Sequence, residues 1–164
     1  MKYFNIFFLY SILGHLMETI VSIFWPGESG ILYGFWTPIY GFGVLLILSA
    51  SYVLQKYFQK YSWKYYLALF FTSFFGLTVI ELIGGFLIKY LFHEELWDYS
   101  DLPLHIGPYI SVPVSFIWGI GSILLVRWIQ PFLERFLKCI PRWITVLCVF
   151  LFGLDNIWTF LSKV

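Results

Sequence analysis

Residues 74–90 read FFGLTVIELIGGFLIKY, and this stretch decides what kind of fold the chain can form. It lies within a longer apolar run, at about 65–92, and carries a single carboxyl group, that of Glu81. A run of about 20 apolar residues is long enough to cross the hydrocarbon core of a bilayer as a helix. A charge at that depth is costly, and intramembrane acids are therefore functional candidates. Two questions follow: how many such runs the chain has, and what Glu81 does.

The composition of the whole chain agrees with this stretch. Of its 164 residues, 60% are hydrophobic and only 12% are charged, whereas a soluble domain has about 25% charged residues. Further apolar runs lie at about 3–25, 37–54, 109–128 and 143–161. Lipid offers the backbone no hydrogen-bond partner, so each run should be helical. The sequence therefore predicts an all-α, polytopic integral membrane protein, a compact bundle of about five transmembrane helices forming a single transmembrane domain over 1–164.

The loops between the expected spans differ in charge. Lysine and arginine residues occur in the loops near 55–64 and 129–142, whereas the loops near 26–36 and 93–108 have none. By the positive-inside rule, this asymmetry predicts a cytoplasmic N-terminus and an extracytoplasmic C-terminus in a plasma (inner) membrane. The formal net charge is +1, and no basic stripe indicates a nucleic-acid partner. The lipid bilayer is the partner that the composition does imply.

Polar residues recur at helical spacing within several of these spans. Counting 1.5 Å per residue along each helix places four titratable side chains at similar depth. They are His15, Glu18, Glu81 and Asp155. We expect them to form an intramembrane polar pocket in which Glu81 faces Glu18, because isolated charges facing lipid are costly. The alternative is that each acid only ties helices together by bonding serine or threonine neighbours.

Two segments that we expect on the outer face add further candidates. The glycine-rich segment GILYGFWTPIYGFG, at 30–43, contains Tyr33 and Tyr40 and forms either a re-entrant cover over the pocket or an ordinary turn with interfacial aromatics. The segment LWDYSD, at 96–101, mixes aromatic and acidic side chains, and we expect it to fold back onto the bundle. The outer-face candidates are Tyr33, Tyr40, Trp97, Asp98, Tyr99 and His105.

Several segments together resemble the ABC-transporter type IV, or CmpB-like, membrane family of bacteria. They are GHLMETI, GILYGFWTPIYGFG, IELIGGFLIKYLF, LWDYSD and FIWGIG, and the resemblance covers roughly 14–131. The sequence departs from the family pattern at Phe35, where a proline is usual, and at His105, near an expected asparagine. The resemblance implies a transporter permease subunit, with a separate ATPase subunit or a homo-oligomer as its partner.

The sequence leaves three functions open. The first is a transport subunit that handles an ion or a small polar solute through the acidic pocket. The second is an intramembrane enzyme acting on a lipid or lipid-linked substrate, with Glu18 or Glu81 as acid or base and His15 assisting. The third is a structural or assembly protein. No metal motif is present, since Cys139 and Cys148 lack a metal or redox spacing. We expect no cofactor, and the sequence does not decide whether the chain is an enzyme.

Overall fold

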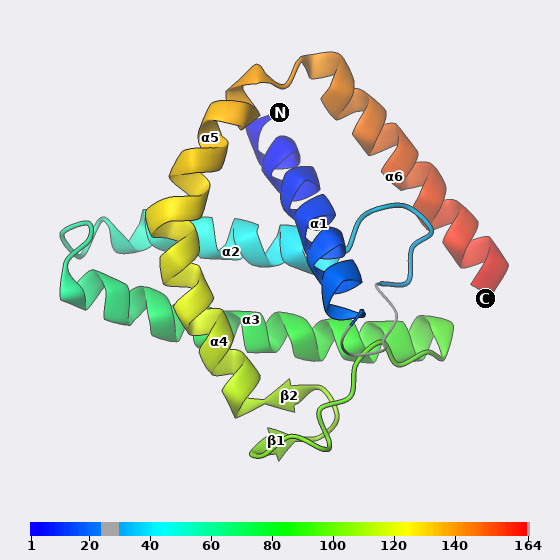
Figure 1. Ribbon diagram of the computed structural model, residues 1–164, viewed down its shortest axis with the longest axis horizontal. Helices are drawn as coiled ribbons and strands as arrows, with labels where there is room; N and C mark the ends of the chain where they lie inside the picture. The colour runs from blue at the N-terminus through cyan, green and yellow to red at the C-terminus, as the bar shows by residue number, and fades with distance from the viewer. Residues whose placement is uncertain (24–29, 164) are drawn as a thin grey trace.

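The computed structural model describes residues 1–23 and 30–163, and Figure 1 shows that most of them are helical. The elements in chain order are α1 (Lys2–Val21), α2 (Pro38–Leu54), α3 (Trp63–Phe92), β1 (His105–Ile106), β2 (Ile110–Ser111), α4 (Val112–Leu124), η1 (Leu125–Ile129), α5 (Gln130–Cys139) and α6 (Arg142–Lys163). Among the described residues, the two short antiparallel strands are the whole of the sheet structure.

Four helical stretches are long and apolar enough to cross a membrane. They are Lys2–Val21, Trp63–Phe92, Val112–Cys139 and Arg142–Lys163. The remaining helix, Pro38–Leu54, is apolar but has 17 residues, which is at the short end of the usual range of about 17–25. The all-α membrane architecture is thereby confirmed, with α4, η1 and α5 forming one continuous helix. Trp25, the expected end of the first span, lies outside the described residues.

The fourth helix differs from the expected span of 109–128. It begins at Val112 and continues through η1 to Cys139. The reason is a single turn of π-helix, in which the backbone N–H of Gln130 donates to the carbonyl of Leu125, five residues back. Pro131 follows directly at the start of α5. Proline has no N–H to donate, and the wider turn before it lets the helix continue instead of ending.

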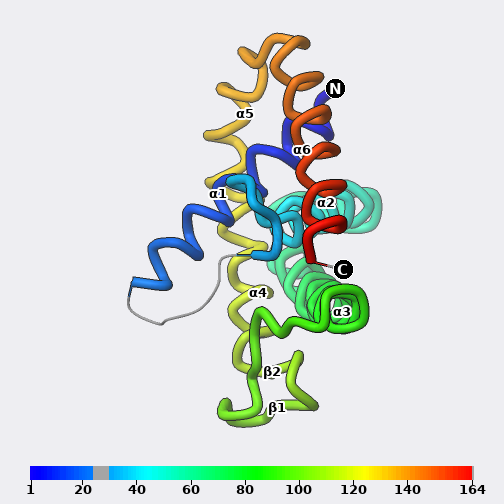
Figure 2. Tube along the Cα trace, turned by 90° about the vertical axis from the view of Figure 1, so that its right-hand side faces the viewer, coloured from blue at the N-terminus to red at the C-terminus, as the bar shows by residue number. Residues whose placement is uncertain are grey.

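The helices do not all run in parallel. Helices α2 and α3 lie side by side as a hairpin, while α1 and the α4–α5 helix cross them, as Figures 1 and 2 show from two directions. Helix α6 stands at the edge, where its main helical contact is with α1. The buried core lies where α1, α2, α3 and the α4–α5 helix meet, and it includes Ile6, Val44, Leu69, Leu77 and Leu125.

Side-chain contacts bring the basic segments together at one end of the molecule. Lys2 pairs with Glu134 on α5 at 2.7 Å, and Thr145 on α6 donates to Asn5 at 2.5 Å. Arg127 lies over the ring of Tyr61 in the turn between α2 and α3, with its guanidinium 4.7 Å from the ring centroid. The start of α1, the α2–α3 turn and the α5–α6 junction are thus linked through the α4–α5 helix.

Candidate functional site

Glu81 is buried at the centre of the contact between α3, α4 and the segment that follows α3. Glu81 is only 5% exposed. The Tyr99 hydroxyl donates to Oε1 at 3.1 Å. The other oxygen, Oε2, is buried without a hydrogen-bond partner among the described residues. Within the same part of the chain, no lysine, arginine or histidine forms an ion pair with Glu81. The carboxyl group therefore has a hydroxyl donor, and the Trp118 indole beside it, but no cationic partner.

Glu18 lies in the same region, although it comes from α1. The Thr37 hydroxyl donates to its Oε2 at 3.2 Å. Tyr40 on α2 lies close enough to both Glu18 and Glu81 to sense their charges, and so does Tyr99. Each carboxyl group thus has a tyrosine hydroxyl beside it, that of Tyr40 for Glu18 and that of Tyr99 for Glu81.

Trp118 on α4 completes this group. Its indole N–H lies beside the Glu81 carboxyl, and its ring packs edge-to-face against Tyr40 with 6.0 Å between centroids. The indole nitrogen is itself buried without a partner in the described part of the chain. We call these side chains the acidic cluster; its members are Glu18, Tyr40, Glu81, Tyr99 and Trp118.

Close contact between α1 and α2 places Tyr40 in the cluster. The ring of Tyr40 lies directly on Gly14, one turn before Glu18, where any side chain would collide with it. The backbone N–H of Thr37 donates to the carbonyl of Ser11 at 3.0 Å, which fixes the start of α2 on α1. Small residues permit this kind of helix approach in membranes. Gly14 thereby holds the Tyr40 hydroxyl in reach of Glu18.

The segment after α3 folds back onto the helices through its aromatic residues, as expected, while its acid remains outside. Trp97 and Tyr99 are partly buried, and Asp98 is exposed. Asp98 accepts hydrogen bonds from the Ser100 hydroxyl at 2.6 Å and from its backbone N–H at 2.8 Å. These bonds lower the pKa of the Asp98 carboxyl below its usual value. His105 is also exposed, and its Nδ1 lies 3.0 Å from the carbonyl of Leu102.

Asp155 is not among the neighbours of the acidic cluster. It was grouped with Glu18 and Glu81 on depth alone, but it binds the loop between α1 and α2 instead. The backbone N–H groups of Tyr33 and Gly34 donate to it at 3.1 and 2.9 Å, and the Trp36 indole donates at 2.6 Å. With these partners, Asp155 anchors the loop to α6.

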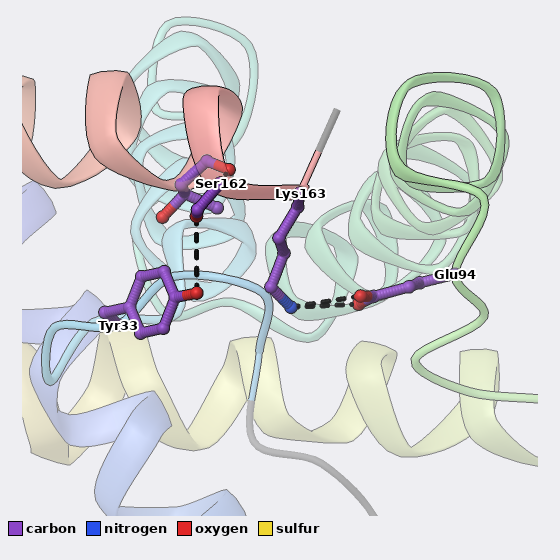
Figure 3. A network of polar contacts seen from close by, with 5 residues as sticks. Tyr33, Glu94, Ser162 and Lys163 are labelled. Atoms are coloured by element: carbon purple, nitrogen blue, oxygen red, sulfur yellow. Dashed lines mark hydrogen bonds and ion pairs between the residues drawn. The ribbon is translucent and has the colours of Figure 1, made fainter.

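The same loop meets the ends of α3 and α6. The Tyr33 hydroxyl lies 3.3 Å from that of Ser162, so the Tyr33 side chain points toward α6 (Figure 3). Beside this pair, Lys163 binds both carboxylate oxygens of Glu94 at 3.1 Å (Figure 3). These contacts hold the far end of α6 to the end of α3.

His15 lies one turn before Glu18 but has different surroundings. Its ring packs edge-to-face on Phe35, with 5.7 Å between centroids. Its Nδ1 is buried without a partner among the described residues, and no contact there joins it to either glutamate. Within residues 1–23 and 30–163, no set of three or more His, Cys, Asp or Glu side chains is suited to hold a metal ion.

Sequence reasoning missed two members of the site. Thr37 is the first residue of the expected span 37–54, and Trp118 lies within the expected span 109–128. The sequence signal for Trp118 is its spacing of three residues from Ser115, which places both on one face of a helix. In the structure, the Ser115 hydroxyl lies 2.6 Å from that of Thr78, one turn before Glu81 on α3. The polar stripes of α3 and α4 therefore face one another, and Trp118 follows Ser115 by one turn.

The fold and the acidic cluster define the class of the protein, a small polytopic α-helical membrane protein with paired carboxyl groups within its spans. The family described as "Putative ABC-transporter type IV" matches residues 5–160, nearly the whole chain. The chain belongs to this family. Searches of curated proteins and of solved structures give no match.

The anchoring role of Asp155 yields a prediction about stability. Replacing Asp155 with alanine leaves the N–H groups of Tyr33, Gly34 and Trp36 without their acceptor. Those of Gly34 and Trp36 are partly buried, and a buried donor left without a partner costs about 1–3 kcal/mol. We expect a clearly lower Tm in detergent for Asp155→Ala and a smaller loss for Asp155→Asn, which keeps an acceptor oxygen. The neighbouring Asn156→Ala is the control, since Asn156 is exposed and donates only to the Phe152 carbonyl. Equal Tm values for Asp155→Ala and Asn156→Ala would show that Asp155 does not anchor the loop.

Proposed function

We propose that this chain is the membrane-spanning subunit of a transporter and that its acidic cluster binds a proton or a small cation during transport. The observation that carries the proposal is Glu81, a carboxyl group buried within a span, with a hydroxyl and an indole N–H beside it and no ion-pair partner in the described part of the chain. An ionised carboxyl group in such surroundings is costly. A proton or a cation would remove that cost.

The placement of the two carboxyl groups on different helices suggests how binding is linked to movement. Glu18 belongs to α1 and has the Tyr40 hydroxyl beside it, whereas Glu81 belongs to α3 and binds the Tyr99 hydroxyl. When both are ionised they repel each other, whereas a cation attracts both. Occupancy therefore changes the preferred separation of α1 and α3. A ligand that binds one arrangement better shifts the protein toward it.

The family supports transport and also limits what this chain does alone. The sequence of this chain has no GxxxxGK[ST] phosphate-binding loop, so an ATPase would be a separate subunit. Most of α6 is exposed apolar surface, which would face lipid or a second copy of the chain. We propose a single transmembrane domain that works with a separate ATPase or as a homo-oligomer. An ATPase that co-purifies from native membranes would support the first arrangement.

We propose an inner-membrane orientation with the N-terminus in the cytoplasm and the C-terminus outside. The contacts that gather the basic segments near Lys2 and Arg127 support it, because basic segments remain on the cytoplasmic side. Single cysteines at Lys60 and Asp98, in a chain with Cys139 and Cys148 replaced by serine, test it. An impermeant thiol reagent should label position 98 in intact cells and spare position 60. The reverse pattern would invert the proposed topology.

The transport proposal is tested by ion flux in vesicles. The purified protein, together with any ATPase that co-purifies, is reconstituted into vesicles loaded with a dye sensitive to protons, Na⁺ or K⁺. Imposed proton, Na⁺ or K⁺ gradients should then produce a flux above that of empty vesicles, and Glu81→Gln should abolish it. A wild-type flux that equals the empty-vesicle background, or one that survives Glu81→Gln, would reject the assignment of transport to this cluster.

A further inference from the structure

We infer that the acidic cluster is reached between α3 and the segment 97–111, which acts as a movable cover over Glu81. The inference rests on the proposed function for the identity of the permeating species, which is a proton or a small hydrated cation. The position of the route follows from the contacts of the cover itself. In the proposed orientation, the route opens to the outside of the cell.

The cover meets α3 at two consecutive glycines. The indole ring of Trp97 lies over Gly84, with its nearest atom 3.6 Å from the place of a Gly84 Cβ. The ring of Tyr109 lies directly on Gly85, where a Cβ would be 2.6 Å from it. The two rings also contact each other edge-to-face, with 6.2 Å between centroids. Tyr109 also packs edge-to-face on Phe86 of α3, with 5.4 Å between centroids, so opening of the cover must separate this ring pair as well.

Unpaired polar atoms in the cover disfavour a permanent seal. The indole nitrogen of Trp97 and the hydroxyl groups of Tyr109 and Ser111 are buried with no hydrogen-bond partner among the described residues. A buried polar atom without a partner costs free energy, and water restores its hydrogen bond. Opening of the cover would hydrate all three atoms. The opened route would then carry hydrogen-bonding groups suited to a hydrated ion or to a chain of water molecules.

One hydrogen bond ties the cover to the acidic cluster, the 3.1 Å bond that Tyr99 donates to Glu81. Burial, and after it the charge of Glu81, raises the pKa of the Tyr99 hydroxyl. The hydroxyl therefore keeps its proton and serves as a donor at neutral pH. This bond is stronger to an ionised carboxylate than to a neutral carboxyl group. Neutralisation of Glu81 by a proton or a cation thus loosens the cover.

Internal bonds let the cover move as a unit. The backbone N–H of Tyr99 donates to the carbonyl of Pro108 at 2.7 Å. The strand pairs His105–Ser111 and Ile106–Ile110 close the remainder of the segment. These bonds lie within the cover, so they survive its separation from α3.

Access to Glu81 is measured by labelling with an impermeant, water-soluble carbodiimide and an amine, followed by mass spectrometry of the full-length protein in membranes. The reagent is applied from the side that carries the cover. We expect slow labelling of wild-type Glu81 relative to the exposed Glu95, which serves as an internal reference. Gly85→Ala should raise the rate about tenfold, which corresponds to an overpacking cost of about 1.4 kcal/mol. Gly121→Ala is the matched control, since nothing lies within 4 Å of its Cβ position.

Trp97→Ala is the second variant in case Gly85→Ala does not fold, and it should also speed the labelling. Unchanged labelling of Glu81 in both folded variants, or faster labelling from the opposite side, would show that segment 97–111 does not control access to Glu81. The readout does not depend on transport. Faster labelling together with a wild-type flux no greater than that of empty vesicles would leave the route standing and reject only the proposed function.

Discussion

Replacing Gly41 with alanine is expected to lower the free energy of unfolding by about 1–3 kcal/mol, the usual cost of overpacking a close contact. A Cβ on Gly41 would collide with the Ser11 hydroxyl and would lie 2.6 Å from the ring of Phe7. It would also lie 2.7 Å from the backbone carbonyl oxygen of Phe7. A side chain can rotate away, but a backbone oxygen moves only if the helix moves. The substitution therefore forces α1 and α2 apart.

Separation of these helices should also disturb the acidic cluster. Thr37 and Tyr40 reach Glu18 because the start of α2 lies against α1. Thermal unfolding in detergent measures the loss of stability, and the flux assay measures the effect on the cluster. Gly121→Ala is again the control and should be neutral or slightly stabilising, because alanine favours helices more than glycine does. Equal stability of Gly41→Ala and Gly121→Ala would show that α1 and α2 accommodate the added Cβ without loss of stability.

The helices were predictable because the bilayer restricts the chain to few solutions. A long apolar run must satisfy its own backbone hydrogen bonds, so hydropathy alone indicates a helix. The run expected at about 65–92 is found as Trp63–Phe92. The fourth helix shows where this reasoning stops. Pro131 predicts a helix end, and no local pattern announces that a π-turn over Leu125–Ile129 will carry the helix past it.

Candidate residues were predictable by type and depth, but their partners were not. Glu18, Glu81 and Asp155 all lie well inside expected spans. Depth does not state which helix faces are in contact, and Asp155 on α6 binds the loop between α1 and α2 instead of the acidic cluster. Tyr40 reaches the glutamates through its contact with Gly14, a pairing between two helices that periodicity within each one cannot reveal.

The largest functional effect is expected for Glu81→Gln. Glutamine has nearly the same shape as glutamate, and its amide oxygen can still accept the hydrogen bond from Tyr99. The glutamine amide cannot bind a proton at neutral pH, and it has no negative charge to pair with a cation. Removing one partner of a buried charge pair costs about 2–5 kcal/mol, so ion affinity should fall by about 30-fold or more. We therefore expect the flux in vesicles to be lost while the protein still inserts and melts near the wild-type Tm.

Two comparisons separate this outcome from a general effect of removing an acid. Glu95→Gln removes an exposed carboxylate that pairs with Lys89, and it should leave the flux unchanged. Glu18→Gln should also lower the flux, because residues that act together on one ion are both needed to bind it. If Glu81→Gln retained full flux, its carboxyl group would serve only to hold α3, through Tyr99, against the segment that covers it. A wild-type flux in Glu18→Gln would instead show that Glu18 does not act on the same ion as Glu81.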